Sequence, residues 1–103
     1  MAETKTKARR NPKKPDPLVQ FGISEELALN LMRDMLVYRR FEEKAEEAYA
    51  IGKIGGFCHL HIGQEGAAAG SIKPLRDDDY VMSAYREHTQ ALAKGVTPNA
   101  VMA

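Results

Sequence analysis

The sequence is poor in the residues that build several common kinds of protein. It has one cysteine and no tryptophan among 103 residues, which excludes an internal disulfide and a cysteine-rich zinc module. Its longest run without a charged residue, 54–64, is short and contains two histidines, so we expect no membrane-spanning segment. Apolar residues make up 44% of the chain and charged residues 28%, a composition typical of a globular protein.

The N-terminal segment also lacks the features of a targeting signal. It has no apolar core, which excludes a secretory signal peptide from residues 1–16. It is rich in lysine, interrupted by proline and contains Glu3, which are not the features of a mitochondrial presequence. We therefore expect a reducing compartment, and the sequence favours a bacterial cytoplasm over a mitochondrial matrix.

Residues 1–17 are predicted to form a disordered basic tail. They carry six basic and two acidic side chains, a charge of 6 − 2 = +4, whereas the whole chain has a net charge of +1. Beyond Met1 they contain no large apolar residue, and they contain three prolines. The charge is compatible with binding an acidic partner or nucleic acid, and also with a role in solubility alone. Since no aromatic residue lies among the basic ones, we expect no nucleic-acid partner.

A long amphipathic helix is predicted to begin after Ser24. This serine can cap the helix, and Glu25 and Glu26 suit its positive end. Gly52 is expected to end the helix, which would make it about 28 residues and roughly 42 Å long. Apolar residues recur every three or four positions and define one face, namely Leu27, Leu31, Met35, Tyr38, Phe41, Ala45 and Tyr49.

Shorter elements are predicted after Gly52. Residues 64–71 and 87–94 read as helices, Thr97 and Pro98 begin another, and residues 80–82 read as a short strand. One strand cannot complete an α/β layer. We therefore interpret residues 18–103 as the N-terminal part of a larger α/β protein, or of one that takes its sheet from another chain.

Histidines 59, 61 and 88 and Cys58 are candidate reactive groups. Three imidazoles can bind zinc, but the spacing supplies no accompanying carboxylate, so we assign no metal ligand. His59 and His61 would share a face in an extended segment, whereas the adjacent Cys58 would point away from His59. We therefore interpret Cys58 as a small buried apolar residue.

Tyr85 and Arg86 form a second candidate group because they follow the predicted strand, where α/β proteins bind ligands. The Arg86 guanidinium can form two parallel hydrogen bonds with a phosphate, and the Tyr85 hydroxyl can add a third. The alternative is a surface arginine paired with Glu87 or with the aspartates at 77–79.

Four short sequences occur together in the chain: RRFEEK at 39–44, GGFCHL at 55–60, GQE at 63–65 and YREH at 85–88. The order and spacing of these four pieces are those of a known family. Over residues 18–103 the chain resembles the alpha subunits of thiamine-diphosphate-dependent 2-oxo acid dehydrogenases. GGFCHL resembles the pyruvate type most. The resemblance implies an α/β thiamine-diphosphate-binding fold that is mostly helical in this part, with one or two short strands. One difference is His61, where the family more often has tyrosine.

The resemblance also implies a function. The enzyme would decarboxylate pyruvate with thiamine diphosphate and pass the acetyl group to the lipoyl group of a second component, which makes acetyl-CoA. Tyr85 and Arg86 correspond to the cofactor-binding pair, His59 to the active-site histidine, and Phe57 to the lining of the same channel. A beta subunit would complete an alpha2beta2 heterotetramer, Mg²⁺ would be held by residues beyond 103, and this part alone would be inactive.

Two alternatives stay open at this point. One is the alpha subunit of a branched-chain 2-oxo acid or acetoin dehydrogenase, which shares the arginine-glutamate helix at 39–44 and the tyrosine-arginine element at 85–88. The other is a non-enzymatic helical module with a basic tail that docks a partner.

Overall fold

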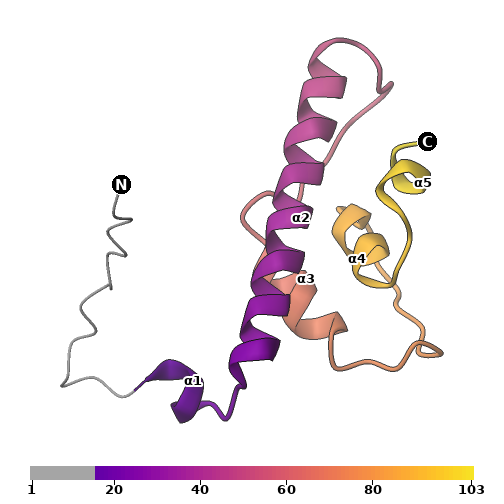
Figure 1. Cartoon of the computed structure of the whole chain (residues 1–103). Helices are drawn as coiled ribbons and strands as arrows, with labels where there is room; N and C mark the ends of the chain where they lie inside the picture. The colour runs from indigo at the N-terminus through magenta and orange to yellow at the C-terminus, as the bar shows by residue number, and fades with distance from the viewer. Residues whose placement is uncertain (1–15) are drawn as a thin grey trace, which may run out of the picture.

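The structure, a computed structural model, describes residues 16–103, so the predicted tail, apart from its last two residues, lies outside the described residues. Within this range the regular elements are all helices: α1 (Pro17–Gln20), α2 (Glu25–Ala50), α3 (Glu65–Ile72), α4 (His88–Ala93) and α5 (Pro98–Met102) (Figure 1). None of the helices in residues 16–103 is long and apolar enough to cross a membrane.

The long helix α2 confirms the predicted helix and both of its ends. The Ser24 hydroxyl accepts a hydrogen bond from the Leu27 amide at 3.1 Å, which satisfies one of the free amides of the first turn. At the other end, Gly52 has a φ of 77°, a left-handed conformation that glycine adopts without strain. The middle of the predicted apolar face is buried, while its two ends are exposed.

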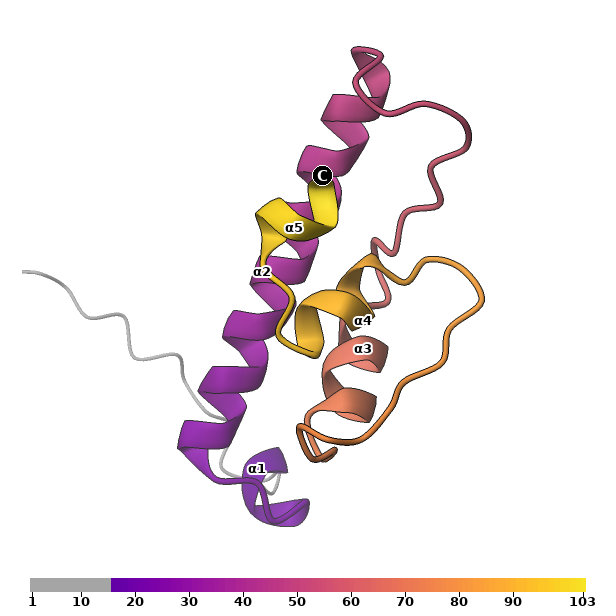
Figure 2. The ribbon, with the colours of Figure 1, turned by 90° about the vertical axis from the view of Figure 1, so that its right-hand side faces the viewer.

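Helices α3 and α4 pack beside α2, and α5 contacts α4, as Figures 1 and 2 show from two directions. The centre of this packing is Tyr38 of α2 against Ala68 and Ala69 of α3. Alanine has no side chain beyond Cβ, so its surface lets a bulky tyrosine ring lie close to the α3 backbone. Four partly buried residues complete the cluster: Leu31, Met35, Leu92 and Ala93.

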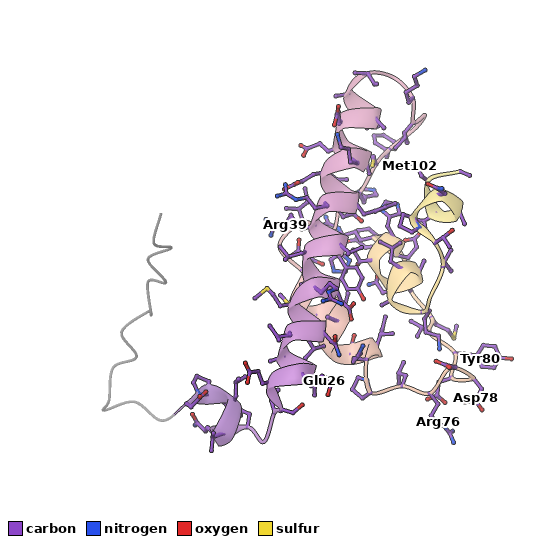
Figure 3. All side chains as sticks on the ribbon, in the orientation of Figure 1. Glu26, Arg39, Arg76, Asp78, Tyr80 and Met102 are labelled. Atoms are coloured by element: carbon purple, nitrogen blue, oxygen red, sulfur yellow. The ribbon has the colours of Figure 1, made fainter. Side chains whose placement is uncertain are left out.

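The strand predicted at residues 80–82 is wrong. These residues belong to the irregular segment between α3 and α4, and the side chains of Tyr80 and Met82 are each 97% exposed. Figure 3 shows Tyr80 projecting outward from this loop, close to Arg76 and Asp78. A strand needs a neighbour for its backbone hydrogen bonds, and no part of residues 16–103 forms a ladder with it. The α/β class is therefore not confirmed by this part of the chain, which is helical wherever it is regular.

A second apolar stripe lies on α2, outside the contact with α3 and α4. Leu29, Met32 and Leu36 are more than half exposed, and their spacing of three and four residues places them on one side of the helix. Leu36 also borders an apolar groove of about 460 Å³ between α2 and α5. A helix that is apolar on two sides is typical of one that is covered on both.

We expect Ala68→Leu to destabilise the protein by about 1–3 kcal/mol, the usual effect of overfilling a packed core. Ala68 is buried against Tyr38, so the added atoms have no space. Ala67→Leu on the exposed side of α3 is the matched control and should change stability by less than about 0.5 kcal/mol. Chemical denaturation measures both variants, and equal effects would contradict the described packing of α3.

Candidate functional site

Two loops meet at the candidate site: residues 57–62, which lead from α2 into α3, and residues 80–87, which lead into α4. Arg86 Nη1 donates a hydrogen bond to the Leu60 carbonyl at 3.3 Å. The rings of His59 and Tyr85 meet edge to face, with their centroids 5.2 Å apart and an interplanar angle of 75°. The structure therefore brings together three of the predicted site residues, His59, Tyr85 and Arg86.

Arg86 has an unusual backbone. Its φ of 59° makes it the one residue other than glycine with a positive φ in residues 16–103. This conformation places Cβ too close to the following carbonyl and is disfavoured by roughly 1–2 kcal/mol for an L-residue with a side chain. The predicted helix start at Glu87 is confirmed to within one residue, because α4 begins at His88. Arg86 thus lies in the loop, just outside the helix.

The Arg86 guanidinium has no acidic partner in the described part of the chain. Its one side-chain hydrogen bond goes to Leu60, its Cζ lies 5.3 Å from the centroid of the Tyr85 ring, and its Nε is buried without a partner. No carboxylate in residues 16–103 pairs with it. The alternative of a surface arginine paired with Glu87 or with aspartates 77–79 is therefore wrong; Asp78 and Asp79 pair with Arg76 instead.

His61 lies beneath this cluster and is 3% exposed. Its Nδ1 is 2.9 Å from the Arg86 carbonyl oxygen and 2.7 Å from the Thr89 hydroxyl oxygen. Because a carbonyl can only accept, Nδ1 carries the proton and donates it. His59 is exposed, so the two histidines that were expected to share a face lie in different surroundings.

Glu65 fixes the start of α3, directly after this loop. Its carboxylate accepts hydrogen bonds from Arg39 Nε at 2.5 Å, from Arg39 Nη2 at 3.3 Å and from the Gly63 amide at 3.0 Å. These donors, with Arg39 contributing most, lower the pKa of Glu65 to about 2. The ion pair joins α2 to α3 and sets the position at which the 57–62 loop ends.

A second polar cluster lies between α2 and α4. The fully buried Glu42 has its Oε1 3.0 Å from His88 Nδ1. A hollow of about 150 Å³ beside His88 is also bordered by Phe57 and Cys58. Phe57 is 91% exposed and borders this hollow, so its role in the channel stays a prediction. Burial, together with nearby Glu42, raises the pKa of the Cys58 thiol, which keeps it protonated at neutral pH.

The sequence reasoning missed Glu42, Thr89 and the contact between His61 and Arg86. Glu42 gave a readable signal, because it stands four residues after Tyr38 and three before Ala45, inside the apolar face of the helix. A carboxylate at such a position needs a buried partner. Thr89 gave no comparable signal. In residues 16–103, no group of three or more histidine, cysteine, aspartate or glutamate side chains is placed to hold a metal ion.

Comparison with known proteins gives a match to the dehydrogenase E1 component family over residues 33–103. The chain is 49% identical over 80 residues to the pyruvate dehydrogenase E1 component subunit alpha of Rhizobium meliloti (strain 1021). It is 50% identical over 87 residues to the protein of that name from Zymomonas mobilis. It is 42% identical over 93 residues to the chloroplastic subunit alpha-3 of Oryza sativa subsp. japonica.

These alignments cover 78%, 82% and 90% of this chain, but 23%, 24% and 22% of the three relatives. The chain therefore spans about a quarter of the length of the curated relatives it matches. No solved structure matches the chain.

Glu65→Gln is expected to make stability less dependent on pH in acid. The folded-state pKa of about 2 lies below the usual value of about 4.3 for an unfolded chain. The carboxylate therefore stabilises the fold fully above about pH 4.3, and this contribution is lost as the pH falls towards 2. The melting temperature of the parent should fall more steeply across this window than that of the variant.

Glu43→Gln is the matched control, because Glu43 pairs with the exposed Arg40 on the surface of α2, and exposed pairs contribute little. It should follow the parent at every pH. Parallel melting curves for the parent and Glu65→Gln would contradict the role assigned to the Arg39–Glu65 pair.

Proposed function

The chain belongs to the dehydrogenase E1 component family, and from this premise we propose that it is part of the alpha subunit of a pyruvate dehydrogenase. The single observation that carries the proposal is the meeting of His59, Tyr85 and Arg86 where two loops join. The complete enzyme decarboxylates pyruvate and passes the acetyl group to a lipoyl group of the second component, which yields acetyl-CoA. The relatives described above are all pyruvate dehydrogenase subunits, which favours pyruvate over branched-chain 2-oxo acids or acetoin.

The residues of the site fit the diphosphate of thiamine diphosphate. Arg86 is a cation without a carboxylate partner in the described part of the chain, and its Nε is buried and unpartnered. A guanidinium in this situation favours a multiply charged anion with several acceptor oxygens. Tyr85 is 57% exposed, so its hydroxyl is available to donate a further hydrogen bond to the same anion. Arg86 and Tyr85 therefore bind the diphosphate, and the accompanying Mg²⁺ takes its ligands from elsewhere in the enzyme.

His59 acts on the reacting groups. When bound, thiamine diphosphate would supply a nucleophilic thiazolium carbon for the chemistry at the 2-oxo group of the substrate. His59 is exposed and its two ring nitrogens have no hydrogen-bond partner in residues 16–103, so its imidazole is available to donate a hydrogen bond to a substrate oxygen or to transfer a proton. The contact with Tyr85 sets the direction of the His59 ring, and Phe57 lines the approach to it.

The proposal includes the partners that such an enzyme needs. A beta subunit completes an alpha2beta2 heterotetramer with an α/β fold, and a lipoyl-bearing second component receives the acetyl group. The exposed apolar stripe on α2 supports burial against further protein, because patches of this kind mark interaction surfaces. We place the enzyme in a bacterial cytoplasm and propose neither a membrane nor a nucleic-acid partner.

Arg86→Ala in the complete enzyme should weaken thiamine diphosphate binding by about 1.5–3 kcal/mol, the range for hydrogen bonds to a charged group. This corresponds to a rise in Kd of roughly 10- to 150-fold, measured by calorimetry with Mg²⁺ present. Arg76→Ala is the matched control, because this exposed arginine pairs with Asp78 and Asp79 and should not affect Kd. An unchanged Kd in Arg86→Ala would remove this residue from the diphosphate site.

His59→Ala should lower kcat by about 10²- to 10⁴-fold, the usual contribution of a positioned proton-transfer group. The Kd of thiamine diphosphate should stay close to that of the parent, because His59 is assigned to the reacting groups and not to the diphosphate. Steady-state kinetics and calorimetry on the same preparation separate the two effects. Parental kcat would leave His59 with a packing role alone.

A further inference from the structure

We propose that His61 is a positioning residue for Arg86. Its Nδ1–H donates to the Arg86 carbonyl and holds the left-handed backbone from which the guanidinium projects. The consequence for cofactor binding rests on the proposed function, in which Arg86 binds the diphosphate. The restraint on the Arg86 backbone rests on the geometry of His61 alone.

The Arg86 backbone needs a restraint from outside its own loop. Its φ of 59° is disfavoured for any residue with a Cβ, and such conformations persist only where the surroundings over-determine them. Residues 80–87 are irregular, and α4 begins two residues after Arg86. Neither a helix nor a strand therefore imposes this conformation on Arg86.

His61 is well placed to supply the restraint because it is itself immobilised. The imidazole is 3% exposed, and its Nδ1 lies 2.9 Å from the Arg86 carbonyl oxygen. The same nitrogen lies 2.7 Å from the hydroxyl of Thr89, which is fully buried in the first turn of α4. One imidazole thus joins the peptide of Arg86 to α4. Arg86 Nη1 also donates a hydrogen bond to the carbonyl of Leu60, the residue before His61. The 57–62 loop therefore fixes the direction of the Arg86 side chain as well as its backbone.

The geometry assigns the proton of His61 to Nδ1. The Arg86 carbonyl can only accept, and the Thr89 hydroxyl can donate to Gln90 Oε1 at 3.3 Å, which leaves the hydroxyl oxygen to accept. Nε2 is buried without a partner, so it adds nothing to the restraint. A replacement should therefore preserve the function only if it puts an N–H at the position of Nδ1. The asparagine amide nitrogen reaches that position, whereas the glutamine amide extends towards the position of Nε2.

The experiment uses the complete enzyme with its beta subunit and compares His61→Gln with His61→Asn. The Kd of thiamine diphosphate and of inorganic diphosphate, each with Mg²⁺, is measured by calorimetry. We expect His61→Gln to weaken both by about tenfold, the effect of one lost hydrogen bond, and His61→Asn to restore most of the affinity. Arg76→Ala, at the exposed arginine that pairs with Asp78 and Asp79, is the control and should leave the Kd of inorganic diphosphate unchanged. Equal Kd values for the parent and His61→Gln, in an enzyme whose Arg86→Ala variant binds diphosphate more weakly, would overturn the proposal.

A double substitution distinguishes a failure of this inference from a failure of the proposed function. If His61 acts through Arg86, His61→Gln should add nothing to the effect of Arg86→Ala, because the two changes remove one shared interaction. Additive effects would show that His61 acts elsewhere and would overturn the inference. An Arg86→Ala variant with the parental Kd would instead refute the diphosphate role of Arg86, and the φ of Arg86 in a crystal structure of His61→Gln would still decide whether His61 restrains it.

Thr89→Val provides a second route if His61→Gln does not assemble with its beta subunit. It keeps the volume of the side chain and removes the hydroxyl that steadies Nδ1. We expect a rise of about threefold in the Kd of inorganic diphosphate, the effect of a weakened hydrogen bond. No change in this Kd would overturn the proposal.

Discussion

The hydrogen bond between the His61 imidazole and the Arg86 carbonyl is the contact on which the candidate site depends. It joins two loops that are 25 residues apart in the sequence, and neither loop has regular structure of its own. Because these loops carry His59, Tyr85 and Arg86, their relative position determines whether the three side chains face one ligand. The strength of such a contact comes from burial, since a donor and an acceptor that are shielded from water must satisfy one another.

The helices act as the frame for this contact. Tyr38 and the alanines of α3 set the distance between α2 and α3, and the Arg39–Glu65 ion pair fixes where α3 begins. The hydrogen bond between Thr89 and His61 then fixes the imidazole relative to α4. The site residues thus lie on loops, but each loop is bounded by a helix whose position is set by packing, an arrangement that is common in binding sites.

Sequence reasoning recovered the features that depend on local chemistry. The capping by Ser24, the end of the helix at Gly52 and the helical start at Pro98 are each decided by a few neighbouring residues. It failed at residues 80–82, where β-forming side chains cannot make a strand without a partner. It also left the partner of Arg86 undecided and missed the buried Glu42 and Thr89, because such contacts join residues far apart in the chain. The resemblance named the site residues, but only the fold could bring them together.

The conformation of Arg86 has a consequence for how this position can change. Glycine would adopt the same backbone angles with no steric penalty, so the fold alone would favour it. Arginine at this position lowers the stability of the native state but supplies a positive charge. Residues in such strained conformations are typical of sites where stability and activity are in conflict. Variants selected for folding alone should therefore drift towards glycine at this position, whereas the proposed role of Arg86 at the diphosphate would keep arginine in variants selected for activity.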